Sequence, residues 1–231
     1  MDKNIIVTGA SRGIGYQTAL ELAQQKHTVI AIARSTERLE KLAAERTEGT
    51  IIPLPADLTS QEDIKNIEQQ LATMDGIHGL INNAGAVQRK AFMDTDMEDW
   101  QKLVDINLYA IVSLTQAIKP HMPAGSHIVN ISSMSGFQGS SKFPGLSVYG
   151  ASKAAVIGLS EVLSTEFAED DIAVNCLCLG AVQTEMLEEA FPGFEAPVSA
   201  QQIGQYVANF VLSSHHFYNG KVLPVALNNP E

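Results

Sequence analysis

Tyr149 and Lys153 form a pair whose residue types and spacing suggest acid–base chemistry. Residues 148–153 are predicted to open a helix, in which a spacing of four places both side chains on one face, one turn apart. A phenol has a pKa of about 10, so it is a poor acid–base group at neutral pH unless a nearby cation favours its phenolate. Lys153 can supply that charge, and a phenol tuned in this way would serve as a general acid.

Three serines close the predicted strand that precedes this helix: Ser132, Ser133 and Ser135. A hydroxyl at that point can donate a hydrogen bond to the oxygen atom that the acid protonates, which fixes and polarises the reacting group. The residues alone leave the choice among the three serines open.

A glycine-rich turn, Thr8-Gly9-Ala10-Ser11-Arg12-Gly13-Ile14-Gly15, follows the first predicted strand. Glycines in such a turn allow a tight bend, a close approach of the backbone to a pyrophosphate, and close packing of the following helix on the strand. A tight strand–helix connection without a ligand is the alternative interpretation. The Gly-x3-Gly-x-Gly spacing in this context predicts a dinucleotide site.

This turn and four further motifs, in order along residues 4–184, resemble the short-chain dehydrogenase/reductase family. The motifs are Thr8-Gly9-x3-Gly13-x-Gly15, Asp57-Leu58, Asn82-Asn83-Ala84-Gly85, Asn107, and Ser133 with Tyr149-x3-Lys153. Each one follows or lies on the element where the family has it. The resemblance implies a Rossmann-like fold, a nicotinamide cofactor and an oxidoreductase activity.

The resemblance also implies roles for the chemical residues. The Ser-x-x-Gly frame of the family selects Ser133, because Gly136 follows three residues later. Tyr149 would protonate a substrate carbonyl oxygen, Ser133 would donate to the same oxygen, and Lys153 would also hold the nicotinamide ribose. Asn107 would organise a water relay to the lysine; the same residue could also simply bend its helix. The predicted catalytic set is Asn107, Ser133, Tyr149 and Lys153.

The same motifs imply a cofactor site along the carboxyl ends of the strands. Asp57 and Leu58 would border the adenine, residues 83–85 the adenosine ribose, Val182 the carboxamide, and Thr184 the pyrophosphate. The predicted cofactor-binding residues are Gly9, Ser11, Arg12, Gly13, Ile14, Gly15, Arg34, Ser35, Asp57, Leu58, Asn83, Ala84, Gly85, Tyr149, Lys153, Gly180, Val182 and Thr184.

The end of the second predicted strand indicates which nicotinamide cofactor binds. Rossmann proteins that prefer NAD place an acidic residue there for the ribose 2′-hydroxyl, but residues 31–35 contain none. Arg34 follows the strand, and Arg12 in the glycine turn faces the same ribose. Two guanidiniums can form charge-assisted bonds to a 2′-phosphate, each worth roughly 1.5–3 kcal/mol, and Ser35 could add a hydroxyl. Two solvated arginines are the alternative, and we predict NADP(H).

Three segments beyond these motifs bear on the substrate. Residues 140–144 lengthen the interval between Ser133 and Tyr149, and they either shape the substrate pocket or form a surface insertion. Leu179 stands where the family usually has a proline. Residues 185–198 are expected to form a mobile lid. Its apolar side chains suit an uncharged carbonyl compound, whereas its glutamates either disfavour anionic substrates or form a solvated loop.

Short apolar runs alternate with amphipathic helical stretches along the whole chain. Strands are predicted at 5–7, 28–33, 50–54, 77–81, 127–131, 172–177 and 221–226, and helices at 14–25, 37–45, after a Ser60 cap, and at 97–118, 148–167 and 199–212. Apolar strands between helices form a parallel sheet that is covered on both faces. Right-handed crossovers then give a doubly wound α/β fold of about seven strands in one domain, residues 1–231.

Composition narrows the class of protein further. The 231 residues are 45% apolar and 18% charged, with a formal net charge of −11, which excludes a disordered chain and disfavours a nucleic-acid partner. Cys176 and Cys178 are predicted to be buried thiols of a reducing cytosol. The start of the chain resembles no secretory signal and the apolar run 108–118 is too short for a membrane, so we expect a cytoplasmic protein. His215-His216 make a poor metal site, and no metal is predicted.

These features together predict an NADPH-dependent reductase that converts a carbonyl of a small, uncharged substrate to an alcohol. The alternatives are reduction of 3-oxoacyl thioesters and a non-catalytic NADP(H) sensor. The predicted helices 97–118 and 148–167 carry apolar residues on more than one face, and a second apolar stripe usually meets a partner. Because the family pairs these two helices across a two-fold axis, we predict a homodimer, or a homotetramer that also uses the last helix and strand.

Overall fold

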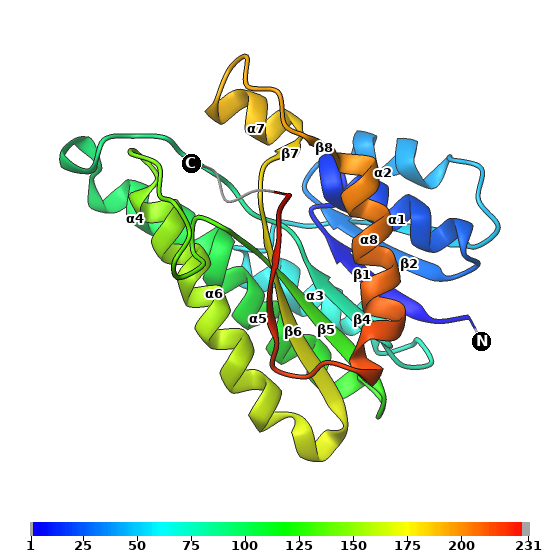
Figure 1. Ribbon diagram of the computed structural model, residues 1–231. Coiled ribbons are helices and arrows are strands. Elements are labelled where there is room, and N and C mark those ends of the chain that lie inside the picture. The colour runs from blue at the N-terminus through cyan, green and yellow to red at the C-terminus, as the bar shows by residue number, and fades with distance from the viewer. Residues whose placement is uncertain (1, 228–231) are drawn as a thin grey trace.

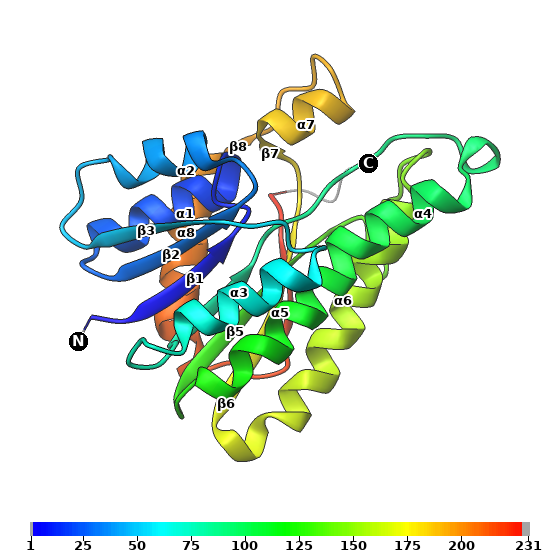
Figure 2. The same ribbon diagram turned by 180° about the vertical axis from the view of Figure 1, so that it is seen from behind.

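Residues 2–227, which the computed structural model describes, form a central parallel sheet with helices on both faces (Figures 1 and 2). The strands are β1 (Asn4–Thr8), β2 (Thr28–Ala33), β3 (Thr50–Pro55), β4 (Gly79–Asn82), β5 (Ser126–Ser133), β6 (Ile172–Leu179) and β9 (Val222–Val225). Their order across the sheet is β3-β2-β1-β4-β5-β6-β9, and the switch point lies between β1 and β4. The predicted doubly wound, Rossmann-like α/β fold is confirmed.

Six of the eight helices in residues 2–227 pack against apolar cores on the two faces of the sheet. The eight are α1 (Gly13–Gln24), α2 (Thr36–Ala43), α3 (Gln61–Leu71), α4 (Met97–Val104), α5 (Ala110–Ile118), α6 (Ser147–Glu166), α7 (Glu185–Ala190) and α8 (Ala200–Ser213). Helices α1, α2 and α8 cover one face, and α3, α5 and α6 cover the other. Successive residues of a strand point to opposite faces, so Ile5 packs in the first core and Ile6 in the second.

The cap of α3 illustrates how local sequence positions the loop that follows β3. Ser60 caps the helix as predicted, because its Oγ accepts a hydrogen bond from the Asp63 backbone N–H at 3.2 Å. The Asp63 carboxylate does not return to Ser60; it accepts from the backbone N–H of Asp57 at 2.7 Å instead. The cap therefore also fixes a residue at the predicted cofactor site.

The predicted helix 97–118 is not continuous. Helix α4 ends at Val104, a π-helical turn covers Asp105–Tyr109, and α5 begins at Ala110. Single π turns inside helices occur frequently at functional sites, and Asn107 lies in this one. The sequence pattern cannot distinguish a π turn from regular helix, because apolar periodicity continues through it.

The segment predicted as a lid contains regular structure that the sequence pattern missed. Strands β7 (Val182–Gln183) and β8 (Val198–Ser199) pair with each other, and between them α7 projects above the carboxyl edge of the main sheet (Figure 1). Thr184 caps α7, since its Oγ1 accepts from the Leu187 N–H at 3.2 Å. Six helical residues are too few to show an amphipathic period.

Strand β6 carries both cysteines on one face. Cys176 and Cys178 are buried and free, which confirms the prediction of unpaired thiols. Across residues 2–227, no helix combines the length and the apolar character that crossing a membrane requires.

Candidate active site

A single cavity of about 1280 Å³ runs along the carboxyl edge of the sheet, from the end of β2 to the turn after β5. Small-ligand pockets typically enclose about 300–1,000 Å³, so this cavity has room for a dinucleotide and a substrate together. All but one of the predicted cofactor-binding residues line it; the exception is Gly15. Of the predicted catalytic residues, Ser133, Tyr149 and Lys153 line it, and Asn107 lies behind its wall.

The glycine turn between β1 and α1 has a geometry that fits a pyrophosphate. Gly9 and Gly13 have φ values of +67° and +59°, in the left-handed region that favours glycine. A Cβ on Gly15 would lie 2.4 Å from the Gly9 carbonyl oxygen, so Gly15 permits the tight packing of the turn and does not face the cavity. The turn leads directly into α1, whose first N–H groups have no partner within the helix and can bind an anion.

Thr8 joins the ends of β1 and β4 at the switch point of the sheet. Its buried Oγ1 accepts from the backbone N–H groups of Asn83 and Ala84, each at 2.9 Å, and the Asn83 side chain donates to the Thr8 carbonyl at 2.8 Å. These bonds hold the Asn-Ala-Gly motif against the glycine turn. Thr8 is part of the sequence motif, but the motif spacing alone does not reveal this role.

Ser133, Tyr149 and Lys153 meet at the other end of the cavity. Ser133 ends β5, and its Oγ accepts from the Ser135 N–H at 3.1 Å, while Tyr149 is on α6 and lines the same part of the cavity. Lys153 is buried on α6, with its Nζ donating to the Ile131 carbonyl at 2.9 Å and lying 6.0 Å from the centre of the Tyr149 ring. The fold thus places on one cavity the Tyr–Lys pair that the spacing predicted and the serine that the family resemblance selected.

Burial has the largest effect on the pKa values of Tyr149 and Lys153. It raises the pKa of the Tyr149 phenol, and the Ser133 hydroxyl partly opposes this shift. Burial also lowers the pKa of Lys153 to about 8. The residues predicted a lysine that lowers the pKa of the phenol, but in the protein alone burial raises the pKa of Tyr149.

Asn107 uses its whole carboxamide to hold neighbouring segments. Its Oδ1 accepts from the Ala86 N–H at 2.8 Å, and its Nδ2 donates to the Ala86 carbonyl at 3.0 Å and to the Ser152 Oγ at 3.1 Å. A Cβ on Gly85 would come within 2.9 Å of Asn107 Oδ1 and 3.4 Å of Lys153 Nζ. Asn107 and Lys153 therefore approach the same glycine, which explains why a side chain cannot stand there.

The other serines and the glycine of the β5 turn pack against α6. Ser132 is buried and its Oγ donates to the Lys153 carbonyl at 2.7 Å. A Cβ on Gly136 would lie 2.5 Å from the Lys153 carbonyl carbon. The turn after Ser133 packs directly against the backbone of α6, and this close contact leaves space only for glycine at position 136.

Leu179, in place of the usual proline, extends β6 beyond its predicted end. Its carbonyl accepts from the Met134 N–H at 2.9 Å, and the next residue, Gly180, donates to the Val225 carbonyl at 3.0 Å. Strands on both sides therefore hold the turn by backbone hydrogen bonds, which compensates for the missing proline ring.

Residues 140–144 form part of the cavity wall. Ser141 and Phe143 line the cavity, and the Phe143 ring stands edge-on to Phe191 of the lid at 6.1 Å between centres. Lys142 Nζ donates to the Phe137 carbonyl at 2.6 Å and ties the loop to the β5 turn. Of the two interpretations of this insertion, the structure favours a shaped pocket.

Three arginines, Arg12, Arg34 and Arg38, line the cavity at the end of β2, where the sequence predicts the adenosine of the cofactor; we call this the adenosine end. Sequence reasoning missed Arg38, which lies in the first turn of α2, just after Arg34 and the Ser35 cap. Ser35 caps α2 by accepting from the Arg38 N–H at 3.4 Å. Nearby, hydrogen bonds from Thr59 lower the pKa of the Asp57 carboxyl group.

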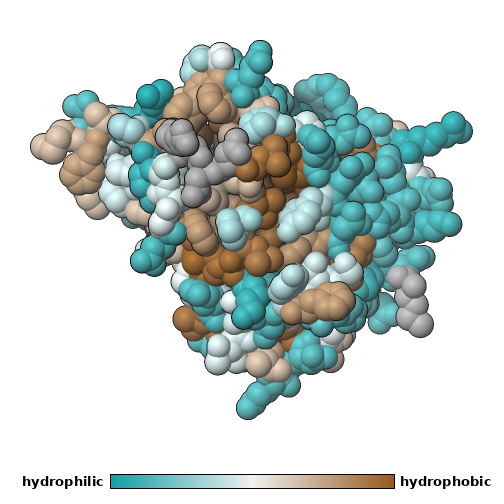
Figure 3. Space-filling view, in the orientation of Figure 1, coloured by the Kyte–Doolittle hydropathy of each residue, from teal (hydrophilic) through white to brown (hydrophobic). Residues whose placement is uncertain are grey.

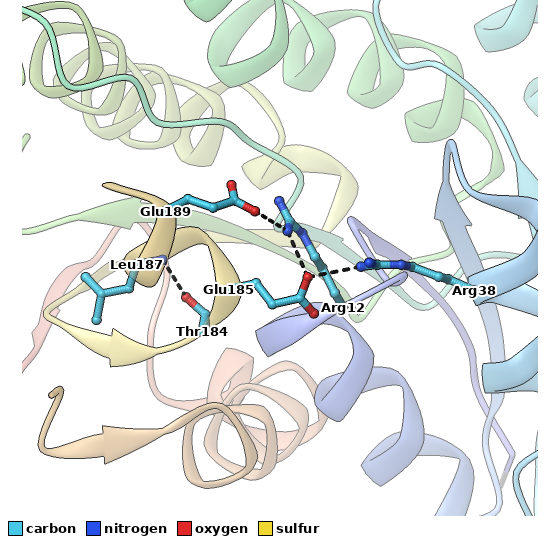
Figure 4. Close-up of polar contacts among 6 residues, drawn as sticks. All are labelled: Arg12, Arg38, Thr184, Glu185, Leu187 and Glu189. Carbon is cyan, nitrogen blue, oxygen red and sulfur yellow. Dashed lines mark hydrogen bonds and ion pairs between the residues drawn. The ribbon is translucent and has the colours of Figure 1, made fainter. Parts of the chain in front are cut away.

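Two lid glutamates pair with these arginines (Figure 4). Arg12 Nη1 lies 2.9 Å from Glu185 Oε2 and 2.7 Å from Glu189 Oε1, and Arg38 Nη1 lies 3.2 Å from the same Glu185 oxygen. The sequence pattern predicted glutamates that either repel anionic substrates or are solvated. Glu185 and Glu189 are exposed to solvent, as the second interpretation holds, and they also form ion pairs with Arg12 and Arg38.

Comparisons with known proteins agree with this geometry. A model described as short chain dehydrogenase matches residues 3–193. A 3-oxoacyl-(acyl-carrier-protein) reductase of Thermotoga maritima is 35% identical over 192 residues, 81% of this chain and 77% of the relative. An NADPH-dependent 1-acyldihydroxyacetone phosphate reductase of Schizosaccharomyces pombe is 33% identical over 80% of this chain and 62% of its own length. A short chain dehydrogenase structure from Burkholderia cenocepacia, in complex with NADP, is 26% identical with a TM-score of 0.87, covering 97% and 96% of the two chains.

Proposed function

We propose that this chain, which belongs to the short-chain dehydrogenase family, reduces the carbonyl group of a small, uncharged substrate to an alcohol with NADPH, reversibly. One observation carries the proposal. Ser133, Tyr149 and Lys153 converge at one end of a cavity whose other end is lined by Arg12, Arg34 and Arg38. The cavity of about 1280 Å³ that joins these ends has room for a ligand with a reactive ring at one end and a charged ribose at the other.

Tyr149 acts as the general acid in this proposal, with Ser133 as its partner. A bound nicotinamide cofactor supplies the hydride. The Tyr149 hydroxyl gives its proton to the substrate oxygen, and Ser133, whose Oγ already accepts from the Ser135 N–H, has its own proton free to donate to the same oxygen. Two donors aimed at one oxygen stabilise the negative charge that develops there.

Lys153 and Asn107 support the acid from behind. With a pKa of about 8, Lys153 carries a proton at neutral pH and stabilises the phenolate that Tyr149 becomes. Its anchor on the Ile131 carbonyl fixes where that charge lies. Asn107 holds the Ala86 loop and Ser152 on α6, and we retain its predicted role in a water relay to the lysine as part of the proposal.

The preference for NADP(H) rests on charge at the adenosine end. The end of β2 offers no carboxylate for a ribose 2′-hydroxyl, and three guanidiniums line the wall there. Arginines form charge-assisted, often bidentate bonds to phosphate. Two of the similar proteins, from Schizosaccharomyces pombe and Burkholderia cenocepacia, are described with NADPH or NADP.

The substrate end is mostly apolar, which supports an uncharged carbonyl compound. Its lining includes Phe143, Leu146, Met186, Leu187, Phe191 and Phe194. Two features favour 3-oxoacyl thioesters as a second candidate substrate: the Thermotoga maritima relative, and Arg89, which lines the same cavity with its guanidinium 5.0 Å from the centre of the Phe191 ring.

Parallel assays of NADPH and NADH oxidation test this function. The panel should include uncharged aldehydes and ketones and a 3-oxoacyl thioester. Turnover of an uncharged carbonyl with NADPH, and much slower turnover with NADH, is the expected result. Preference for the thioester would establish the second candidate. NADPH binding without turnover of any compound would indicate a sensor and contradict the proposal.

We propose a homodimer through α4, α5 and α6. Met97, Tyr109 and Val162 expose large apolar side chains on these elements, with Tyr109 53% and Val162 55% accessible. Apolar residues also gather near the centre of the face shown in Figure 3, where β9 lies in Figure 1, and the alternative tetramer would also use the last helix, α8, and β9. Sedimentation at micromolar concentration should give the mass of two or four chains; a fully active monomer would contradict the proposal.

A further inference from the structure

Helix α7 presents two carboxylates to the arginines of the adenosine end. Glu185 and Glu189 lie one helical turn apart, and Figure 4 shows both directed from α7 toward Arg12, with Arg38 meeting Glu185 from the other side. A single oxygen of Glu185 therefore bridges two guanidiniums. Arg12 Nη1 in turn contacts two carboxylates.

These carboxylates stand where the chemistry of a phosphate would be recognised. Arg12 and Arg38 both line the cavity at its adenosine end, and a guanidinium binds carboxylate and phosphate oxygens by the same charge-assisted hydrogen bonds. Hydrogen bonds to the arginines lower the pKa of Glu185, so it is ionised at neutral pH. A phosphate that reaches Arg12 must share or displace the anions already there.

The pairs are exposed enough to exchange readily. The side chains of Arg12 and Glu189 are 35% and 63% accessible, and ion pairs in contact with solvent contribute little net free energy. A doubly charged phosphate can therefore compete with them. The same pairs also connect α7 of the lid to the glycine turn, although Arg12 and Glu185 are 173 residues apart in sequence. If a phosphate replaces the glutamates at Arg12, α7 loses this connection.

We propose that Glu185 and Glu189 are cofactor-specificity residues. Their carboxylates bind the arginines at the adenosine end and compete there with the 2′-phosphate of NADP(H). This competition reduces the preference of the protein for NADP(H) over NAD(H). The inference rests on the proposed function, in which Arg12 contacts that phosphate. Because binding linkage is reciprocal, a phosphate that weakens the glutamate contacts also frees α7 from the glycine turn. The lid is then less tightly held when NADP(H) is bound than when NAD(H) is bound.

Calorimetric binding of two adenosine ligands tests the competition without any turnover. Adenosine 2′,5′-bisphosphate carries the 2′-phosphate, and adenosine 5′-monophosphate has a 2′-hydroxyl in its place. The Glu185→Gln/Glu189→Gln variant should bind the bisphosphate about 3- to 10-fold more tightly than the wild type, with unchanged affinity for the monophosphate. Glu188→Gln is the matched control, since this exposed α7 glutamate contacts the Gly193 N–H and not the arginines; it should change neither affinity.

Hydrogen exchange of the α7 amides supplies a second readout. In the wild type, the bisphosphate should accelerate exchange in α7, whereas the monophosphate should not. In the double glutamine variant, exchange should already be fast and should not respond to either ligand.

Three outcomes separate this inference from the proposed function. Unchanged or weaker bisphosphate binding by the double glutamine variant would overturn the inference while leaving the NADP(H) preference intact. Weaker monophosphate binding would overturn it too, because the carboxylates would then be acceptors for the ribose hydroxyl. If the wild type and Arg12→Ala bind the bisphosphate with equal affinity, Arg12 does not contact the 2′-phosphate. That result would contradict both the assigned role of Arg12 and the inference.

Discussion

The two ends of the cavity hold their functional groups in opposite ways. At the end with Tyr149, Asn107 and Lys153 are buried to 0% and 4% exposure and are anchored by backbone atoms such as the Ala86 and Ile131 carbonyls. At the adenosine end, Arg12 and Arg38 remain 35% and 47% exposed and are held by side chains of the lid. Backbone anchors fix a geometry, whereas exposed ion pairs can change partners.

The difference follows from solvent. A buried polar group without a partner costs about 1–3 kcal/mol, more if charged, so the buried end tolerates only one arrangement. Exposed ion pairs contribute about 0–1 kcal/mol each and are screened by salt. We infer that the buried end positions reacting atoms and that the exposed end selects among cofactors.

The largest expected effect is at the buried end. Tyr149→Phe should lower kcat by about 10²–10⁴, because it removes a positioned general acid. The affinity for NADPH, measured by calorimetry, should stay within a few-fold of the wild type, since the ring and its packing are retained. Near-normal turnover by the variant would show that another group donates the proton.

The next effect is a pH dependence of stability that originates at Lys153. Its pKa of about 8 lies below the ordinary 10.5, so from pH 8 to 10.5 the unfolded state binds more protons and stability rises with pH. The rise should reach about 3 kcal/mol. Lys153→Met should abolish it in urea unfolding at a series of pH values.

Arg38→Ala is the control for that series. It removes an exposed side chain at the other end of the cavity and leaves Lys153 in place, so its curve should run parallel to the wild type. If the stability curves of the wild type and Lys153→Met run parallel over this pH range, burial does not lower the pKa of Lys153. The two ends of the cavity would then not differ in their electrostatics.

At the exposed end, Arg34→Ala should weaken NADPH binding by roughly 1.5–3 kcal/mol, and Arg34→Ala with Arg12→Ala by more. NADH binding should barely change, because NADH lacks the 2′-phosphate. Dissociation constants for both cofactors, measured at two salt concentrations, provide the check. Equal losses for both cofactors would mean that the arginines do not contact the phosphate.

The smallest effect concerns Ser35, which caps α2 and which we also propose as a phosphate ligand. Ser35→Ala should lower the free energy of unfolding by about 1 kcal/mol through the lost cap and should also weaken NADPH binding. Ser60→Ala, which removes the similar cap of α3, should lose similar stability without loss of NADPH affinity. If Ser35→Ala and Ser60→Ala lose similar stability and both keep their NADPH affinity, Ser35 acts only as a helix cap.

The sequence by itself determined the sheet and the residue types along its carboxyl edge. Strand periodicity and turn chemistry are local, so the alternation of strands and helices could be predicted, and parallel strands necessarily bring their carboxyl ends to one edge. That is why Gly9, Asn83, Ser133 and Arg34, each at or just after a strand end, could be placed at one cavity from their positions alone. The tight turn at Gly9 and Gly13 could also be predicted, because the conformational freedom of glycine is a local property.

Only the tertiary structure decided how these residues interact. The π turn around Asn107 forms where α5 and the Ala86 loop meet, and the pKa of Lys153 depends on burial by segments distant in sequence. The pairing of Arg12 with Glu185 joins residues 173 positions apart. No local pattern encodes such distances or the exclusion of water. Long-range packing sets both, and it made one end of the cavity buried and fixed and the other exposed and exchangeable.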